Sequence, residues 1–240
     1  MANNRLEEIK SNFKQVRREI IGKAESEYRN PGEITIVSVS KTFPAEDIAL
    51  AMQAGIRTFG ENYAQEIKDK IKFFESKERQ PDWHFIGHLQ SNKVKYLFPY
   101  VSLIHTVDSI NLAKEIDTRA GQYNKIQNIL LQVNTSGEES KHGLEPDAVI
   151  GFAKEVQKFE NINTIGLMTI GTFSDDEVII RKEFTMLREL KEALNKSMGI
   201  IKFTELSMGM SHDYKIAIEE GATILRIGTA VFGQRQYYNV

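Results

Sequence analysis

The chain has 240 residues, 41% of them hydrophobic, and a formal net charge of −2. This length corresponds to one or two domains, and the nearly balanced charge gives no electrostatic reason to expect nucleic acid or an anionic membrane as a partner. The sequence contains no cysteine, which excludes disulfides, thiolate metal sites and a cysteine nucleophile.

The sequence shows no sign of a membrane span or a secretory signal. No stretch approaches the ~18 uninterrupted apolar residues that a membrane-spanning helix needs. Residues 1–8 lack the apolar core of a signal peptide. We therefore expect a cytoplasmic protein that does not enter a membrane.

The first element is a predicted amphipathic helix. Apolar residues recur at steps of three and four through residues 6–21, and charged residues separate them. The pattern lasts too few heptads for a coiled coil, so we expect a helix docked on the core. The residues Asn30, Pro31 and Gly32 end it.

From residue 34 onward, predicted strands and helices alternate. The apolar run at residues 34–41 ends at Lys41, and Pro44 then suits the first turn of a helix. Further strands are predicted at residues 57–60, 83–87, 103–106, 128–133, 164–168, 203–207 and 223–227. Helices are predicted at residues 45–54, 63–75, 91–97, 110–120, 146–159, 176–197 and 213–220.

Eight strands that alternate with helices predict an α/β fold, a single-domain (β/α)8 TIM barrel over residues 1–240 with an extra N-terminal helix. A doubly wound open sheet is the alternative, because the strands at 57–60 and 103–106 are short. The barrel requires polar residues and glycines at the carboxyl ends of the strands. They occur there, at Lys41, Asn62, His88, Asn134, Thr169, Ser207 and Gly228.

Lys41 is the leading candidate for chemistry. It ends an apolar strand, where desolvation lowers the pKa of an amine and favours its neutral, nucleophilic form. Such an amine can bond covalently to an aldehyde. The alternative is a solvated loop lysine, as most of the 31 Lys and Arg residues must be.

Two late segments, residues 206–213 and 226–229, predict a phosphate site. Both run from a strand end into a helix start, and Ser211 offers a hydroxyl beside small residues. In barrels, phosphate commonly binds between the loops that follow the last two strands. The alternative for Ser211 is ordinary helix capping.

Arg226 lies two residues before Gly228, on the same face of the predicted strand. If that face points inward, it places a guanidinium in the barrel. The alternative is a salt bridge from Arg226 to an interior carboxylate such as Glu61 or Glu205, because an unpaired buried charge is costly.

Metal binding is not expected. His84 and His88 are four residues apart across a strand end, which differs from the helical spacing of a zinc pair. The other histidines are scattered, and no carboxylate has a spacing that completes a ligand set. Neither a G-x-S-x-G motif nor a P-loop occurs.

A set of short motifs carries a family resemblance. They occur at residues 39–41 (VSK), 59–62 (FGEN), 83–93 (WHFIGHLQSNK), 132–134 (QVN), 166–168 (GLM), 206–213 (LSMGMSHD) and 226–233 (RIGTAVFG). Together they span nearly the whole chain, which resembles the YggS/PROSC family of pyridoxal phosphate homeostasis proteins. This family is in turn similar to the barrel half of alanine racemases.

The resemblance implies that pyridoxal 5′-phosphate is the cofactor and that Lys41 holds it as an internal Schiff base. It implies further that Arg226 faces the pyridine nitrogen and that Asn62 lies close to the ring. The cofactor phosphate would be bound by Ser211, Gly228 and Thr229, with Met210 beside them.

The implied function is a carrier or buffer of the cofactor without robust catalysis. A guanidinium at the pyridine nitrogen disfavours protonation of the ring, which weakens it as an electron sink. The racemases also carry a second base on an added domain, for which this chain has no residues left. We expect a monomer, with pyridoxal-phosphate-dependent apo-enzymes as candidate recipients.

Two enzymatic readings stay open. One is a pyridoxal-phosphate-dependent amino-acid racemase or decarboxylase of narrow scope, with Lys41 as one base and a tyrosine, His84 or His88 as the other. The other is an aldolase that uses Lys41 on a phosphosugar without a cofactor.

Overall fold

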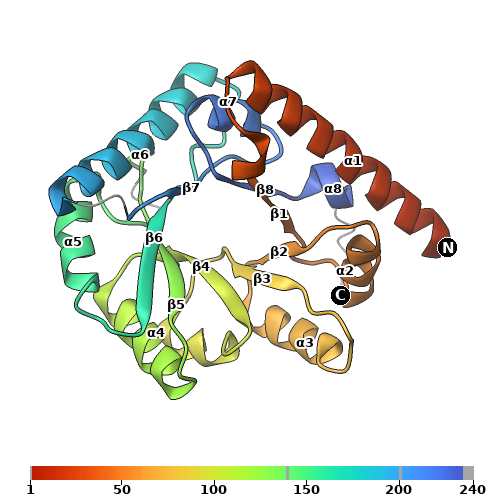
Figure 1. The fold of residues 1–240 in the computed structure, drawn as a ribbon, viewed down its shortest axis with the longest axis horizontal. Coiled ribbons are helices and arrows are strands. Elements are labelled where there is room, and N and C mark those ends of the chain that lie inside the picture. The colour runs from red at the N-terminus through yellow and green to blue at the C-terminus, as the bar shows by residue number, and fades with distance from the viewer. Residues whose placement is uncertain (1, 139–140, 200–201, 235–240) are drawn as a thin grey trace.

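The computed structural model describes residues 2–138, 141–199 and 202–234. Eight parallel strands close into a barrel in the order β1 to β8, and β8 pairs with β1 (Figure 1). The strands are β1 (Thr35–Val39), β2 (Thr58–Glu61), β3 (Asp82–Phe85), β4 (Val101–Val107), β5 (Gln127–Gln132), β6 (Ile162–Met168), β7 (Glu205–Ser207) and β8 (Ile224–Ile227). The predicted TIM barrel is confirmed, and the open-sheet alternative is wrong.

Helices surround the barrel and connect successive strands (Figure 1). The α-helices are α1 (Ala2–Ser26), α2 (Ala45–Gln53), α3 (Ala64–Phe74), α4 (Ile110–Gln122), α5 (Val149–Val156), α6 (Glu177–Met198), α7 (Tyr214–Glu219) and α8 (Thr229–Phe232). Short 3-10 helices are η1 (Pro31–Glu33), η2 (Ser91–Tyr96) and η3 (Pro146–Ala148).

The differences from the predicted elements are local. Residues 91–97 form a 3-10 helix, and the segment predicted as one helix at 146–159 is divided between η3 and α5. The strand predicted to reach Lys41 ends at Val39, so Lys41 lies in the turn that follows. Pro44 precedes α2 as its N-cap residue.

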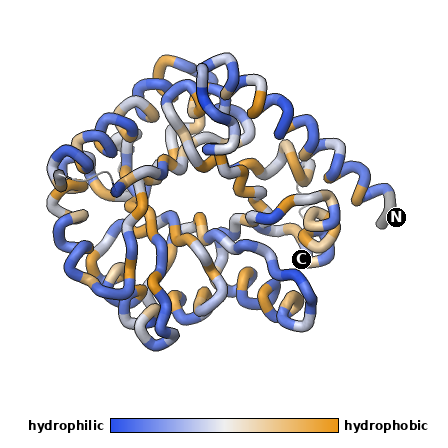
Figure 2. Tube along the Cα trace, viewed as in Figure 1, coloured by the Kyte–Doolittle hydropathy of each residue, from blue (hydrophilic) through white to orange (hydrophobic). Residues whose placement is uncertain are grey.

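The apolar core has two parts. The larger lies between the strands and the surrounding helices and includes Phe59, Trp83 and Phe85. A smaller cluster of Val37, Leu103, Leu130, Met168 and Ile224 fills the barrel interior. Along the strands in Figure 2, hydrophobic colour predominates, whereas the helices alternate in colour, as expected for helices with one buried face.

The N-terminal helix α1 covers the seam where β8 meets β1. It packs against α2, α7 and α8. Tyr214 in α7 donates a hydrogen bond to Glu19, with an O–O distance of 2.7 Å, and Asn12 donates one to the carbonyl of Val231. The extra helix is therefore bonded to the last part of the barrel.

Among the residues that the structure describes, no helix is long and apolar enough to cross a lipid bilayer.

Replacing Gly166 by alanine should destabilise the barrel. A Cβ at Gly166 would lie 2.0 Å from the backbone oxygen of Glu205, its partner in β7. Backbone atoms of two paired strands must then move apart, and we expect a loss of about 3 kcal/mol in the free energy of unfolding. Urea denaturation measures this change.

Gly151→Ala is the matched control, because a Cβ at this position in α5 meets nothing within 4 Å. A helical Gly→Ala exchange should stabilise by up to about 1 kcal/mol. Equal effects of the two substitutions would contradict the close approach of β6 and β7.

Candidate functional site

Lys41 lies in the turn between β1 and α2. The turn contains Thr42 at φ 69°, a left-handed conformation that is rare outside glycine. The ring of Phe43 stacks on Phe232 with 5.0 Å between centroids, which binds the turn to α8. Lys41 itself is half-buried and lies two positions after Val39, the last residue of β1.

Four neighbouring strands bring the predicted site residues together. The Ser40 N–H donates to the carbonyl of Gly60 in β2, so the residue before Lys41 is bonded to the strand that Asn62 follows. On the other side, a Cβ at Gly228 would lie 3.5 Å from the Cβ of Val39. The ends of β7, β8, β1 and β2 thus form one arc of the barrel mouth.

Ser211 joins the two predicted phosphate segments. Its hydroxyl oxygen accepts hydrogen bonds from the N–H groups of Gly228 at 3.2 Å and Ala230 at 3.5 Å. The N-cap residue of α7 is Asp213, so Ser211 does not cap the helix that follows it. Its hydroxyl instead accepts from N–H groups at the start of α8, so the capping alternative holds for that helix. A carboxylate oxygen of Asp213 accepts from the N–H of Met210.

The predicted phosphate residues differ in exposure: Thr229 is exposed, whereas Met210, Ser211 and Gly228 are partly buried. The backbone of Gly209, just before Met210, has φ +92°, and a Cβ there would lie 2.6 Å from the Cβ of Ala217. Glycine at 209 therefore permits the tight turn that carries Met210 and Ser211 to the mouth.

Arg226 lies inside the barrel, where β8 runs beside β1 in register with Val37. Its Nη1 donates to the hydroxyl of Ser207 at 2.6 Å, and its Nη2 donates to the carbonyl of Thr169 at 2.8 Å. Burial lowers the pKa of Arg226 to about 10, with the charge of Asp213 opposing, so the guanidinium stays charged at neutral pH.

The predicted alternative, a salt bridge from Arg226 to Glu61 or Glu205, is wrong. Glu61 pairs with Lys70 at 2.7 Å, and Glu205 accepts a hydrogen bond from Thr223. The cation in the barrel is satisfied by a hydroxyl and a carbonyl.

Sequence reasoning missed the partners of Ser207. The Nδ1 atom of His105 lies 2.9 Å from the Ser207 hydroxyl, and its Nε2 lies 3.0 Å from Nδ1 of His84. All three side chains are buried. His105 lies two residues after Leu103 on the interior face of β4, and a histidine at a buried strand position was the available signal.

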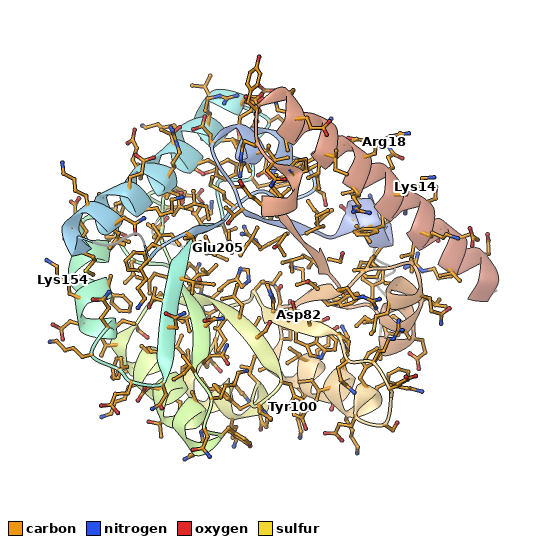
Figure 3. All side chains as sticks on the ribbon, viewed as in Figure 1. Lys14, Arg18, Asp82, Tyr100, Lys154 and Glu205 are labelled. Atoms are coloured by element: carbon orange, nitrogen blue, oxygen red, sulfur yellow. The ribbon has the colours of Figure 1, made fainter. Side chains whose placement is uncertain are left out.

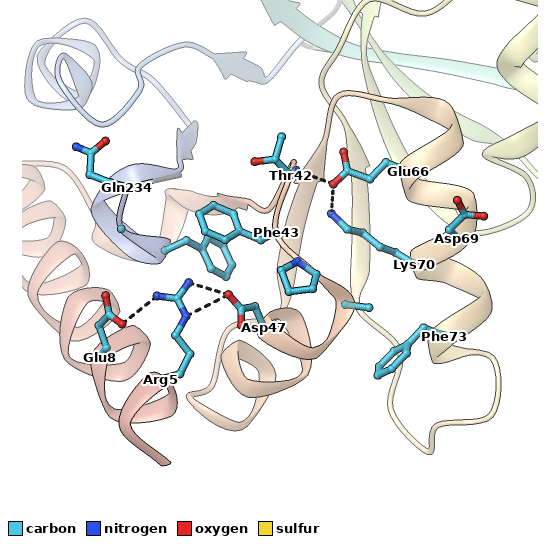
Figure 4. A pocket seen from close by; sticks show the side chains of 14 residues that line it. Arg5, Glu8, Thr42, Phe43, Asp47, Glu66, Asp69, Lys70, Phe73 and Gln234 are labelled. Atoms are coloured by element: carbon cyan, nitrogen blue, oxygen red, sulfur yellow. Dashed lines mark hydrogen bonds and ion pairs between the residues drawn. The ribbon is translucent and has the colours of Figure 1, made fainter. Parts of the chain in front are cut away.

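A second cluster missed from the sequence holds the Lys41 turn. The Nζ of Lys70 donates to the carbonyl of Ser40 at 2.8 Å, to Glu61 at 2.7 Å and to Glu66 at 2.6 Å. Glu66 also accepts from the Thr42 N–H at 2.6 Å, and Figure 4 shows both Glu66 bonds as dashed lines. These contacts fix the backbone on both sides of Lys41.

The carboxyl of Glu61 is buried within this cluster. It accepts from the Ser40 hydroxyl at 2.6 Å through one oxygen, while the other oxygen has no hydrogen-bond partner among the described residues. Burial raises the pKa of Glu61 to about 7, against the opposing charge of Lys70.

A pocket of about 910 Å³ lies outside the barrel wall, between α1, α2, α3 and α8 (Figure 4). Its described lining includes Arg5, Thr42, Phe43, Lys70 and Phe232, but none of the seven predicted cofactor residues. It adjoins the back of the Lys41 turn.

Three further side chains meet where β3, β4 and β5 end. Ligand atoms of His88, Asp108 and His142 lie within 4.8 Å of one another, a convergence that sequence spacing did not indicate. However, the two imidazoles are stacked, with centroids 3.8 Å apart and planes at 12°. Imidazole lone pairs lie in the ring plane, so a cation between stacked rings would meet their faces. As arranged, the cluster is not a coordination set.

Comparison with known proteins identifies the family. The family model described as "Alanine racemase, N-terminal domain" matches residues 5–236. A pyridoxal phosphate homeostasis protein of Aquifex aeolicus is 44% identical over 202 residues, covering 84% of this chain and 87% of its own. The protein of that name from Pasteurella multocida is 38% identical and covers 95% and 98%.

Solved structures of related proteins support the same family. PipY of Synechococcus elongatus, solved with PLP bound, has a TM-score of 0.79 and 32% identity, covering 89% of this chain and all of its own. An alanine racemase of Streptomyces lavendulae shares the fold, with a TM-score of 0.73 and 16% identity over 95% of this chain and 57% of its own. The chain belongs to the family of pyridoxal phosphate homeostasis proteins, within the alanine racemase N-terminal domain family.

Proposed function

We propose that this chain binds pyridoxal phosphate through Lys41 and serves as an intracellular carrier or buffer of that cofactor. One observation carries the proposal: the ends of β7, β8, β1 and β2 bring Ser211, Gly228, Lys41 and Asn62 into one arc, with the charged Arg226 in the interior. The relatives' name and PLP-bound PipY support the same ligand.

The residues at the arc fit this cofactor. The side-chain oxygen of Asn62 is buried without a hydrogen-bond partner among the described residues, so a ligand hydroxyl could satisfy it. When bound, pyridoxal phosphate supplies an aldehyde to which a lysine amine bonds with loss of water.

Each residue has a proposed role. Lys41 provides the amine, and Asn62 accepts from the ring substituent. Ser211 keeps its own hydroxyl proton to donate, because the two bonds described for it are accepted ones; with Met210, Gly228 and Thr229 it would bind the phosphate.

The proposed role of Arg226 is electrostatic. A fixed guanidinium facing the ring nitrogen opposes protonation there by like-charge repulsion. The bound cofactor would then be a poor electron sink, which favours storage and release over turnover.

The racemase alternative has less support from the site. Of its candidate second bases, His84 is bonded to His105 inside the barrel, and His88 is stacked on His142. The cofactor-free aldolase is disfavoured by the PLP-bound relative. We further propose a monomeric, cytoplasmic, single-domain protein that delivers the cofactor to pyridoxal-phosphate-dependent apo-enzymes.

Borohydride reduction of protein incubated with pyridoxal phosphate should add the reduced cofactor's mass to the peptide that contains Lys41. In Lys41→Ala this adduct should disappear, while weaker binding through the phosphate remains, because the Ser211 segment is intact. Peptide mass spectrometry checks the first point and equilibrium dialysis the second.

Lys72→Ala is the control, since Lys72 is exposed on α3. It should be labelled at Lys41 like the unchanged protein. If the adduct persists in Lys41→Ala at the wild-type level, Lys41 is not the residue that bonds covalently to the cofactor.

Glu61 should make stability depend on pH. Its pKa is raised from 4.5 to about 7 on folding, so its favourable contribution is present below pH 4.5 and is lost as pH rises through about 7. Glutamine does not titrate, so Glu61→Gln is the reference. Relative to it, the free energy of unfolding of the wild type should fall by on the order of 3 kcal/mol as pH rises from the unfolded to the folded pKa of Glu61, at about 1.4 kcal/mol per pKa unit.

Urea unfolding of both proteins from about pH 5 to about pH 8 measures the difference, because groups that do not contact Glu61 titrate alike in both. If the two stability curves run parallel, the carboxyl of Glu61 does not titrate in this range.

A further inference from the structure

The buried polar side chains of the barrel interior form a connected series from β8 to β3. Arg226 contacts Ser207, Ser207 contacts His105, and His105 contacts His84. The Nε2 of His84 faces a carboxylate oxygen of Asp82 at 3.6 Å, a distance of electrostatic attraction rather than of a hydrogen bond. Figure 3 labels Asp82 on β3.

One end of this series can only donate. A guanidinium has no acceptor, so the Ser207 oxygen must accept the hydrogen bond from Arg226. The hydroxyl proton of Ser207 is then available, and Nδ1 of His105 lies 2.9 Å from its oxygen. Nδ1 of His105 is therefore the acceptor.

The other end can only accept. The side chain of Asp82 is half exposed and accepts a hydrogen bond from the hydroxyl of Ser102, so it is an ionised carboxylate at neutral pH. The ionised carboxylate favours a proton on the facing Nε2 of His84. With the His84 proton on Nε2, its Nδ1 is bare and accepts from Nε2 of His105.

Hydrogen-bond donation in the opposite direction, from His84 toward Ser207, is unfavourable at both ends of the series. A proton on Nδ1 of His105 would donate to Ser207 and leave the Ser207 proton without an acceptor among the described contacts. It would also make Nδ1 of His84 the donor and turn a bare Nε2 lone pair toward the Asp82 carboxylate. Doubly protonated His105 is opposed by complete burial and by the nearby charge of Arg226, which lower the pKa of His105 well below its ordinary value.

We propose that Ser207, His105 and His84 are positioning residues for Arg226, forming a hydrogen-bonded series of fixed direction that holds its guanidinium in one orientation. The proposal deepens the proposed function and rests on it for the identity of the cofactor. The hydrogen-bonded series consists of protein side chains alone and exists without ligand.

The functional reason for such a series is the geometry of the cation. With two bonds, to Ser207 and to the carbonyl of Thr169, the guanidinium plane is fixed. Without the Ser207 bond, only the described hydrogen bond to the Thr169 carbonyl remains, and the guanidinium plane can rotate about it. A charge that must face a ring nitrogen would then lose its alignment.

Nitrogen-15 NMR of the histidine rings in cofactor-free protein tests the direction of the series. The sequence has five histidines, so single His→Asn variants suffice for assignment. His105 and His84 should each carry a proton on Nε2 and have a bare Nδ1. A proton on Nδ1 of His105, or a doubly protonated ring, overturns the proposal.

Ser207→Ala tests the positioning. In the cofactor-free variant, Nδ1 of His105 should shift toward the position of an unbonded nitrogen. The guanidinium signals of Arg226, separate in the wild type because rotation is hindered, should merge. The matched control is Ser38→Ala, since Ser38 is buried on β1 and its hydroxyl has no partner among the described residues.

In protein loaded with pyridoxal phosphate, Ser207→Ala should weaken cofactor affinity about tenfold, the expected size of one lost bond to a charged group. It should also shift the cofactor's absorption band, whereas Ser38→Ala should leave both within about twofold of the wild type. His105→Asn keeps an acceptor for Ser207 and should fall between the wild type and His105→Leu.

The outcomes separate the two proposals. If the histidine ring protons and the Arg226 signals behave as expected but pyridoxal phosphate does not bind, the hydrogen-bonded series is supported and the proposed function is wrong. If the cofactor binds normally to Ser207→Ala and the Arg226 signals are unchanged, the positioning role is wrong while the proposed function survives.

Discussion

The buried contact between Glu61 and Lys70 is the interaction on which the candidate site depends. Lys70 reaches from α3 to the carbonyl of Ser40, and Glu61 accepts the Ser40 hydroxyl from the end of β2. Three elements therefore meet at the residue before Lys41. A turn between strand and helix is ordinarily among the more mobile parts of a barrel, and here it is held from outside the wall.

Burying this pair carries a large desolvation penalty, so its value lies in geometry rather than in net stability. Removing one partner would leave the other charge uncompensated, whereas apolar side chains in both places could not bond to the Ser40 carbonyl. The same reasoning applies to Arg226, whose charge is met by a hydroxyl and a carbonyl. In both places a backbone carbonyl, of Ser40 or of Thr169, helps to orient a buried cation.

The barrel interior accordingly divides into an apolar and a polar part. Val37, Leu130 and Met168 pack on one another, while Ser207, His105 and His84 bond across the space between β7 and β3. Low effective dielectric in such a site strengthens each satisfied bond and raises the cost of each missing one. A half-complete series would be less stable than an apolar filling, which explains why its members are all engaged.

Much of the fold was predictable because the signals are local. Alternating strands and helices identified the barrel, and Lys41, Asn62 and Gly228 do follow the ends of parallel strands, as the pattern predicted. The partner of Lys70 was not predictable, because Ser40 and α3 meet only after the helix docks. The contact between His105 and His84 likewise depends on the register of β3 and β4, which shifts near His84.

The cluster of His88, Asp108 and His142 was likewise not predictable from local sequence patterns. Each residue follows a different strand, and only the closure of the barrel brings them within 4.8 Å. Arg226 was correctly placed on the interior face by its spacing from Gly228, whereas the alternative of a carboxylate partner was wrong. Periodicity gives the direction of a side chain, whereas its partner is set by a strand elsewhere in the sequence.

The seam beneath α1 has a consequence for biosynthesis. Asn12 bonds to the carbonyl of Val231, 219 positions away, and β1 pairs with β8. The first helix and first strand leave the ribosome long before the partners that complete their hydrogen bonding. The nascent chain must therefore keep an open sheet edge out of contact with neighbouring polypeptides until translation is nearly finished.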